Sequence, residues 1–196
     1  MSYKLKQTNT GGFLITDQLD PDNITGASPL STVVASHVAL GPFIVTTLKL
    51  NNVAQTVVNG TEYQGTKIFD FPQCRMNVLG VTATLQQKTT SALASTLNAS
   101  STGAISLGTA TASATTLAST MVDFLPSTAF VSSATVNVAG TAVTAALAAS
   151  AQFDGTATAK DLYLNTAYAT TGDVDADATQ TISGTVVITW VNLGDL

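Results

Sequence analysis

Charged side chains are scarce in this sequence. Asp, Glu, Lys and Arg make up 10% of its 196 residues, against about 25% in an ordinary soluble domain. The few charges are unevenly spread: residues 1–88 carry six basic and five acidic side chains, whereas residues 89–196 carry one basic and seven acidic ones. Without a cluster of Lys and Arg, binding to a phosphate backbone has no electrostatic basis. We therefore expect no nucleic-acid partner.

Cysteine and histidine each occur once, as Cys74 and His37. A single cysteine excludes an intrachain disulfide, and one histidine with one cysteine excludes an ordinary structural zinc site. A Ser–His–Asp triad would need His37 as its base, but no G-x-S-x-G nucleophile elbow is present. We interpret His37 as a strand-end or core residue and predict no catalytic residue.

Acidic residues form one pattern that is typical of metal binding. Asp173, Asp175 and Asp177 alternate like the first three ligands of a calcium loop. Ala178 stands where such a loop has glycine, and Gly184 stands where it has its closing Glu. We expect a solvated loop there, with no metal ion and no cofactor, and Ca²⁺ binding is the open alternative.

Long apolar runs are absent as well. No run approaches the ~20 apolar residues of a membrane span, and the first residues (MSYKLKQTNTGG) lack the apolar stretch of a secretory signal. We therefore expect no membrane partner and no signal peptide. Glu62 is the only Glu. A glycosidase needs two acids beside a sugar cleft, so an acid pair would have to come from the Asp residues.

The end of the chain has the clearest positive pattern. In residues 180–193 (QTISGTVVITWVNL), alternate positions carry Ile182, Val186, Ile188 and Trp190, and mostly hydroxyl-bearing or β-branched residues stand between them. Successive side chains of an extended strand point to opposite faces. The pattern predicts a long strand with one face on a core and the other partly solvated.

Shorter strand patterns, separated by Gly, Pro and Asn, precede this one. Within them we predict a turn at Asn51-Asn52 and a bulge at Gly80. Asn59-Gly60 is the strongest short hairpin signal in the sequence.

A helical stripe interrupts the strand patterns once. Leu117, Met121, Phe124 and Leu125 recur at helical spacing, which predicts a short helix before Pro126. Strands at intervals of roughly 10–20 residues, with no alternating long helices, point to an antiparallel sandwich. The sequence predicts an all-β, jelly-roll-like, antiparallel β-sandwich with an extended N-terminal arm and at most two short helices.

The sequence divides into an arm, residues 1–32, and a β-sandwich domain, residues 33–196. Only Phe13-Leu14-Ile15 is apolar enough to anchor the arm. Two placements are open, because the arm could dock on its own domain or on a neighbouring molecule. The candidate interface residues for docking on a neighbour are Tyr3, Leu5, Phe13, Leu14 and Ile15.

Four stretches carry a resemblance to known proteins: KIFDFPQCRMNVLGVTATL (67–85), SLGTATASATTLASTMVDFLPSTA (106–129), FDGTATAKDLYLNT (153–166) and TISGTVVITWVNLGD (181–195). They resemble a family of tailed-phage virion proteins, especially those of marine and cyanobacterial phages. The resemblance covers roughly two-thirds of the chain and excludes its first thirty residues. It consists of fold-like motifs and contains no chemical signature.

The resemblance implies a structural head protein without enzymatic activity. We expect a protein that decorates or cements the icosahedral capsid, lies on the virion surface and is made in the host cytoplasm. Its expected partners are the major capsid protein and other copies of itself, in a homotrimer or homodimer. The composition agrees with this expectation, because a charge-poor chain is suited to covering its surface with partners.

Two alternative functions are consistent with the sequence. A head-fibre or tail-tip domain that binds a host surface glycan would use exposed aromatic residues, but Trp190 and Tyr163 both fall within strand patterns and are expected in the core. An esterase or glycosidase would use His37 or a pair of Asp residues.

Overall fold

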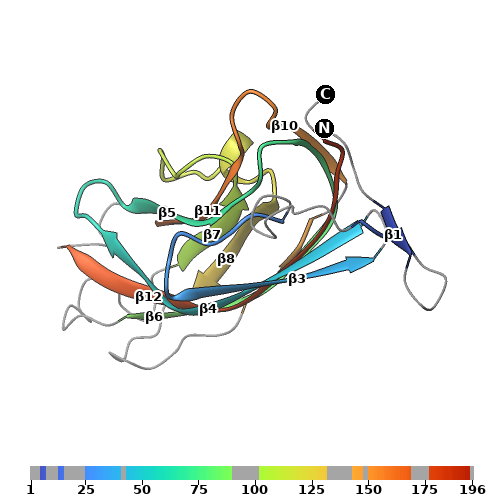
Figure 1. Ribbon diagram of the computed structural model, residues 1–196. Helices are drawn as coiled ribbons and strands as arrows, with labels where there is room; N and C mark the ends of the chain where they lie inside the picture. The colour runs from blue at the N-terminus through green and yellow to red at the C-terminus, as the bar shows by residue number, and fades with distance from the viewer. Residues whose placement is uncertain are drawn as a thin grey trace.

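The structure of the protein is a computed structural model. The structure describes residues 5–7, 13–15, 25–40, 43–89, 102–131, 143–147, 150–168 and 177–194. Within these ranges the chain is almost entirely β-structure, and the sequence-based prediction of an all-β sandwich is confirmed. Figure 1 shows two layers of strands packed face to face.

The two layers are antiparallel sheets of different size. The larger has the order β10-β6-β12-β4-β3, with β9 also paired to β6, and the smaller has the order β5-β11-β7-β8. The larger sheet consists of β3 (Val33–Leu40), β4 (Phe43–Val57), β6 (Arg75–Thr89), β9 (Val143–Ala146), β10 (Ala151–Asp154) and β12 (Ala178–Asn192). The smaller sheet consists of β5 (Tyr63–Asp70), β7 (Thr102–Gly108), β8 (Leu125–Val131) and β11 (Asp161–Tyr168).

The connections between the strands are those of a jelly roll. From β4 onward the chain crosses to the other sheet after almost every strand, and β7 and β8 are the one consecutive pair within the smaller sheet. Both β9 and β10 pair with β6, so they act as one interrupted strand. Two four-stranded sheets joined in this way form the eight-stranded, double-sheet jelly roll, and β3 adds a fifth strand beside β4.

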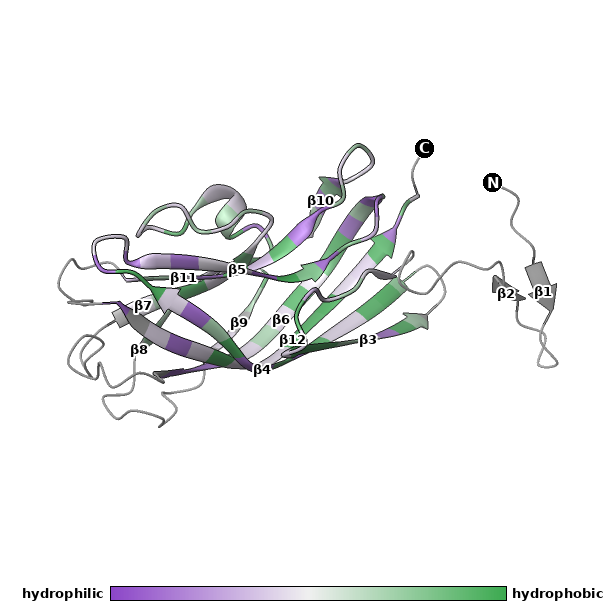
Figure 2. Ribbon diagram, turned by 60° about the vertical axis from the view of Figure 1, so that its left-hand side comes forward, coloured by the Kyte–Doolittle hydropathy of each residue, from purple (hydrophilic) through white to green (hydrophobic). Residues whose placement is uncertain are grey.

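The predicted C-terminal strand is confirmed as the centre of the larger sheet. β12 pairs antiparallel with β4 along one edge and with β6 along the other. Ile182, Val186, Ile188 and Trp190 are fully buried on its inner face. Figure 2 shows the resulting alternation of apolar and polar bands along the strands of this sheet.

Bulges rather than turns bend the long strands. The predicted bulge at Gly80 is confirmed, because Thr189 lies opposite Gly80 and Trp190 lies opposite Val78. The predicted turn at Asn51-Asn52 is wrong, since β4 continues through both residues to Val57. Asn52 adopts a φ of 53°, and its backbone N–H donates to Ser183 Oγ at 2.9 Å. The Asn51-Asn52 pair therefore forms a bulge within a continuous strand and not a turn.

The predicted β-hairpin at Asn59-Gly60 is also wrong. The chain does turn there, because Gly60 has a φ of 82° and the N–H of Thr61 donates to the carbonyl of Val58 at 3.0 Å. The two strands that the turn joins do not pair, however: β4 belongs to the larger sheet and β5 to the smaller one. A turn signal is local, whereas strand pairing depends on which sheet the next strand enters.

The predicted helix before Pro126 is reduced to one 3-10 turn, η1 (Ser119–Met121). Leu117 and Phe124 are buried as the stripe requires, but Leu125 already begins β8. The apolar spacing therefore reflects a loop that packs on the sheet, not a helical face.

Aromatic side chains fill the interior at one end of the sandwich. Phe71 packs edge-on against Trp190 at 5.4 Å between ring centroids and edge-on against Phe69 at 4.9 Å. Phe124 stacks on Phe71 at 5.4 Å and on Phe153 at 4.7 Å. These rings come from both sheets and from the loop after η1, so they join the two layers.

A buried polar network joins the layers elsewhere in the interior. Gln55 of β4 donates to the carbonyl of Leu164 at 2.9 Å and accepts from Thr166 Oγ1 at 2.9 Å. Gln180 of β12 donates to Thr166 at 2.9 Å and accepts from Tyr168 at 2.7 Å. Because these groups satisfy one another, they avoid the cost of burying unpaired polar atoms.

The predicted N-terminal arm contains two short strands, β1 (Leu5–Gln7) and β2 (Phe13–Ile15). They pair antiparallel with each other, and Leu5 lies opposite Ile15. Later in the arm, Ala27 forms an isolated bridge with Asp70 of β5.

Candidate functional site

The loop between β7 and β8, residues 109–124, covers the outer face of the smaller sheet. Asn165, fully buried on β11, holds it in place. Its Oδ1 accepts from the backbone N–H of Ala112 at 2.8 Å, and its Nδ2 donates to the carbonyls of Ala110 at 2.9 Å and Met121 at 3.0 Å. These bonds fix the loop, because the loss of any one of them would leave a buried polar atom of Asn165 or of the loop backbone unpaired.

The loop has a second anchor at its two ends. Asp123 accepts from the backbone N–H of Thr109 at 2.8 Å and from its hydroxyl at 2.6 Å. Burial raises the pKa of Asp123, and the bonds from Thr109 oppose that shift. Apolar contacts of Ala112 and Leu117 with Ala167 complete the attachment.

A depression of about 430 Å³ lies between this loop and β11. Threonine hydroxyls, one lysine, one carboxylate and one aromatic ring gather around it. Its lining residues are Thr109, Ala110, Thr111, Thr120, Thr158, Ala159, Lys160, Asp161 and Tyr163. The depression is the candidate functional site, because it brings several polar groups and a ring to one concave surface.

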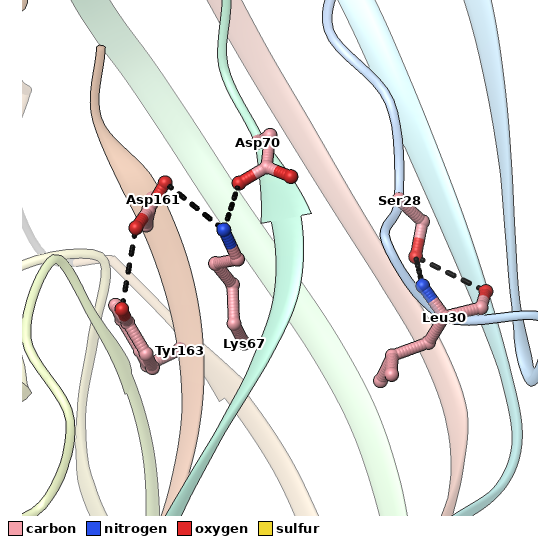
Figure 3. Close-up of polar contacts among 6 residues, drawn as sticks. All are labelled: Ser28, Leu30, Lys67, Asp70, Asp161 and Tyr163. Atoms are coloured by element: carbon pink, nitrogen blue, oxygen red, sulfur yellow. Dashed lines mark hydrogen bonds and ion pairs between the residues drawn. The ribbon is translucent and has the colours of Figure 1, made fainter.

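A cluster of charged residues borders the depression on β5 and β11. Lys67 Nζ lies 2.8 Å from Asp70 Oδ1 and 3.8 Å from Asp161 Oδ1. Tyr163 donates its hydroxyl hydrogen to Asp161 Oδ2 at 3.2 Å. Figure 3 shows the lysine reaching between the two carboxylates. Asp70 and Asp161 lie directly opposite each other in the β5–β11 pairing, so the strand register brings the two acids together.

The pKa values of Lys67, Asp161 and Tyr163 in this cluster are all raised above their ordinary values. Burial raises the pKa of Asp161, the neighbouring Asp70 acts in the same direction, and the Lys67 ammonium group opposes both. The hydrogen bond to Asp70 raises the pKa of Lys67. Burial also raises the pKa of Tyr163. About a third of each charged side chain is exposed, so these ion pairs contribute little to stability.

The N-terminal segment joins the body beside this cluster. The N–H of Ala27 donates to the carbonyl of Asp70 at 3.0 Å, and the N–H of Asp70 donates to the carbonyl of Ala27 at 2.7 Å. Ser28 Oγ then accepts from the N–H of Leu30 at 3.2 Å, which turns the chain toward β3 (Figure 3).

The arrangement suits hydrogen bonding to a ligand rich in hydroxyl groups. A carboxylate, a lysine and several threonines supply acceptors and donors, and Tyr163 supplies a ring with an apolar face. Metal binding is less well served, because Lys67 fills the space between the carboxylates. Over the described parts of the chain, no three His, Cys, Asp or Glu side chains gather into a group that could hold a metal ion.

The single histidine has a structural contact. His37 Nδ1 lies 3.0 Å from Thr46 Oγ1, and that same oxygen accepts from Trp190 Nε1 at 2.9 Å. The imidazole therefore ties β3 to the centre of the larger sheet, in agreement with a core or strand-end role.

The other predicted site residues are dispersed. Asp177 Oδ1 accepts from the N–H of Asn59 at 3.0 Å, while Asp173 and Asp175 lie outside the described residues, so the calcium pattern stays a prediction. Trp190 is fully buried as expected. The expectation of a core position is wrong for Tyr163, which is half-buried and faces the depression.

The predicted arm residues cannot be compared with this site. Tyr3 lies outside the described residues. Leu5, Phe13, Leu14 and Ile15 lie on the β1–β2 pair, of which the structure describes the backbone. Their role in an interface stays a prediction.

Sequence reasoning left an acid pair open but did not identify Asp70 and Asp161. They are 91 positions apart, by subtraction of their residue numbers, and only the β5–β11 register places them side by side. Composition offers no signal for such a pair.

No family model and no curated protein matches this sequence. None of the helical structure in the described residues is long and apolar enough to cross a membrane.

The charged cluster can be tested by titration. We expect Asp70→Asn to lower the pKa of Asp161, because it removes the neighbouring carboxylate, and Lys67→Met to raise it, because it removes the compensating ammonium group. Carboxyl-carbon NMR titration measures both shifts. Shifts of the same sign in both variants would contradict the arrangement.

The raised pKa of Asp161 also makes the stability of the protein depend on pH. The free energy of unfolding that Asp161 contributes is complete below its unfolded-state pKa, and it is lost as the pH rises through its folded-state pKa.

Proposed function

We propose that this chain is a non-enzymatic structural protein of a tailed-phage virion, which decorates or cements the icosahedral capsid. Its sequence stretches resemble such proteins, and the jelly roll is a fold used by viral capsid domains. A fold by itself does not define a function. The observation that carries the proposal is the outer face of the larger sheet.

This outer face is poor in charge and carries several exposed apolar side chains among its hydroxyl-bearing ones. Val34, Val38, Phe43 and Leu79 are 40–56% exposed on its strands. Among the described residues, the charges on the same side of the sheet are few. They are Lys49, Lys88 and the exposed pair of Arg75 and Asp154, whose atoms lie 3.4 Å apart. A surface of this kind is typical of proteins that pack against partners.

The partners in this proposal are the major capsid protein and further copies of the chain. Weak contacts repeated over a symmetric lattice act together through their high effective concentration. Contacts that involve few charges also resist salt, because screening weakens mainly charged interactions. The arm supplies an additional grip if it adds a strand to an exposed sheet edge of the capsid protein.

A cement role predicts that particles depend on this protein for their stability. We expect particles stripped of it to release their genome at a lower temperature than complete particles, because a ligand bound only to the intact shell stabilises that shell. Dye-detected DNA release during heating measures the effect, and re-addition of the purified protein is the control. Equal release temperatures for stripped and complete particles would contradict the cement role.

The depression favours a second candidate function, the binding of a host surface glycan. Its carboxylate, threonine hydroxyls and half-buried Tyr163 suit a sugar ring. In this alternative the protein is a head-fibre or tail-tip domain, and its other contacts hold it on the virion.

Glycan binding predicts a role for Tyr163. In a screen of bacterial surface polysaccharides, we expect Tyr163→Ala to weaken binding by about tenfold or more, since it removes the ring that contacts the ligand. Gln152→Ala, at an exposed position of the other sheet, is the matched control and should bind normally. Absence of binding, or equal binding by both variants, would exclude the glycan function.

A further inference from the structure

Lys160 is the one basic residue among those that line the depression. It ends the loop between β10 and β11, and two backbone hydrogen bonds hold this loop on the body. The N–H of Gly155 donates to the carbonyl of Cys74 at 2.9 Å, and the N–H of Phe71 donates to the carbonyl of Lys160 at 2.9 Å. A Cβ built at Gly155 would lie 3.5 Å from the Cγ of Lys160. The backbone and the stem of the lysine are therefore held beside the depression.

The ammonium group of Lys160 differs from that of Lys67. Lys67 pairs with Asp70 and Asp161, whereas Lys160 takes part in no ion pair within the part of the chain that the structure describes. Its charge lowers the pKa of Asp123, but the carboxylate of Asp123 is bound to Thr109. An ammonium group has three donors and no acceptor, so that of Lys160 is available to a ligand.

The carboxylate in the lining, that of Asp161, is already bound within the protein. Its Oδ2 accepts from the Tyr163 hydroxyl at 3.2 Å, and its Oδ1 lies 3.8 Å from Lys67 Nζ (Figure 3). Burial and the neighbouring Asp70 raise the pKa of Asp161 and so favour its uncharged form. The depression therefore presents a positive charge that is available and a negative charge that is engaged.

Threonine hydroxyls add donors beside the lysine. The hydroxyl of Thr109 is engaged, because it donates to Asp123 at 2.6 Å. Three other lining residues are exposed, and their hydroxyls form no hydrogen bond within the described ranges: Thr111, Thr120 and Thr158. A hydroxyl can donate to a carboxylate and can also accept from a sugar hydroxyl. An ammonium group among such hydroxyls suits an anionic group that is rich in acceptors.

We propose that the depression binds a sugar that carries a carboxylate, and that Lys160 is the residue that selects the charge. The ammonium group of Lys160 pairs with the carboxylate of the sugar. The ring of Tyr163, held by the bond of its hydroxyl to Asp161, packs on the sugar ring. A charge-assisted hydrogen bond is roughly twice as strong as a neutral one, so an acidic sugar binds more tightly than its neutral counterpart.

The overall charge of the chain makes this selection local. The net charge is −5, and an acidic protein does not attract an acidic polymer through its overall field. A preference for acidic sugars must therefore come from the depression itself. The inference rests on glycan binding as the function of the depression, and it adds the chemical class of the glycan.

Acidic polysaccharides and their carboxyl-reduced forms test the proposal. The probes are polygalacturonate, alginate, hyaluronate and polysialic acid. Reduction converts each carboxylate to a hydroxymethyl group, which keeps the sugar ring and removes the charge. Affinity electrophoresis of the full chain gives a Kd for each form. We expect at least one acidic polymer to bind about tenfold or more tightly than its reduced form, because hydrogen bonds to charged groups contribute more than neutral ones.

Three variants separate the role of Lys160 from a general effect of charge. Lys160→Met should reduce the preference to about twofold or less, whereas Lys160→Arg keeps a cation and should retain most of it. Lys49→Met is the matched control, since it removes the same charge from an exposed position on β4 of the other sheet. It should bind like the natural protein. Raising NaCl from about 0.05 to 0.5 M should also weaken the preference of the natural protein.

The outcomes distinguish this inference from the glycan function on which it rests. Equal binding of acidic and reduced polymers would overturn the inference and leave the glycan function in place. The same holds for a preference that Lys160→Met leaves unchanged, or that Lys49→Met reduces equally. Failure of every polymer of both kinds to bind the natural protein would overturn the inference and the glycan function together.

Discussion

The sandwich depends on the position of β12 between β4 and β6. This last strand pairs along both edges over nearly its whole length, and its inner face supplies Ile182, Val186, Ile188 and Trp190 to the core. The larger sheet is therefore incomplete until the C-terminal strand β12 has paired with both β4 and β6. Everything attached to that sheet, including β3 beside β4 and the aromatic cluster around Trp190, takes its place from this strand.

The local features of the fold were predictable from the sequence, because they arise from neighbouring residues. Alternation in residues 180–193 identified the central strand and its buried face, and Gly80 identified a bulge. Asn51-Asn52 and Asn59-Gly60 do mark bends in the backbone. The first bend does not end its strand, however, and the second does not join two paired strands. A two-residue signal describes a bend in the backbone, whereas the partner of the following strand is decided by distant residues.

The candidate site was not predictable for the same reason. Asp70 and Asp161 meet through the pairing of β5 with β11, and Tyr163 faces outward although its strand pattern suggested the core. The buried network of Gln55 and Gln180 was equally hidden, because glutamine at an inward position interrupts the apolar alternation instead of marking it. In each case the chemistry depends on contacts across strands that are far apart in the sequence.

One comparison tests the central position of β12 most directly. Gly184 has a φ of 147°, and a Cβ built there would lie 2.1 Å from the carbonyl oxygen of Thr84 on β6, whereas a Cβ at Gly80 would meet nothing within 4 Å. Urea unfolding should show Gly184→Ala destabilised by about 3 kcal/mol, or unfolded, because both the conformation and the contact require glycine. Gly80→Ala should change the free energy of unfolding by less than about 1 kcal/mol. Equal stability of the two variants would contradict the account, since β12 would then not lie closely against β6.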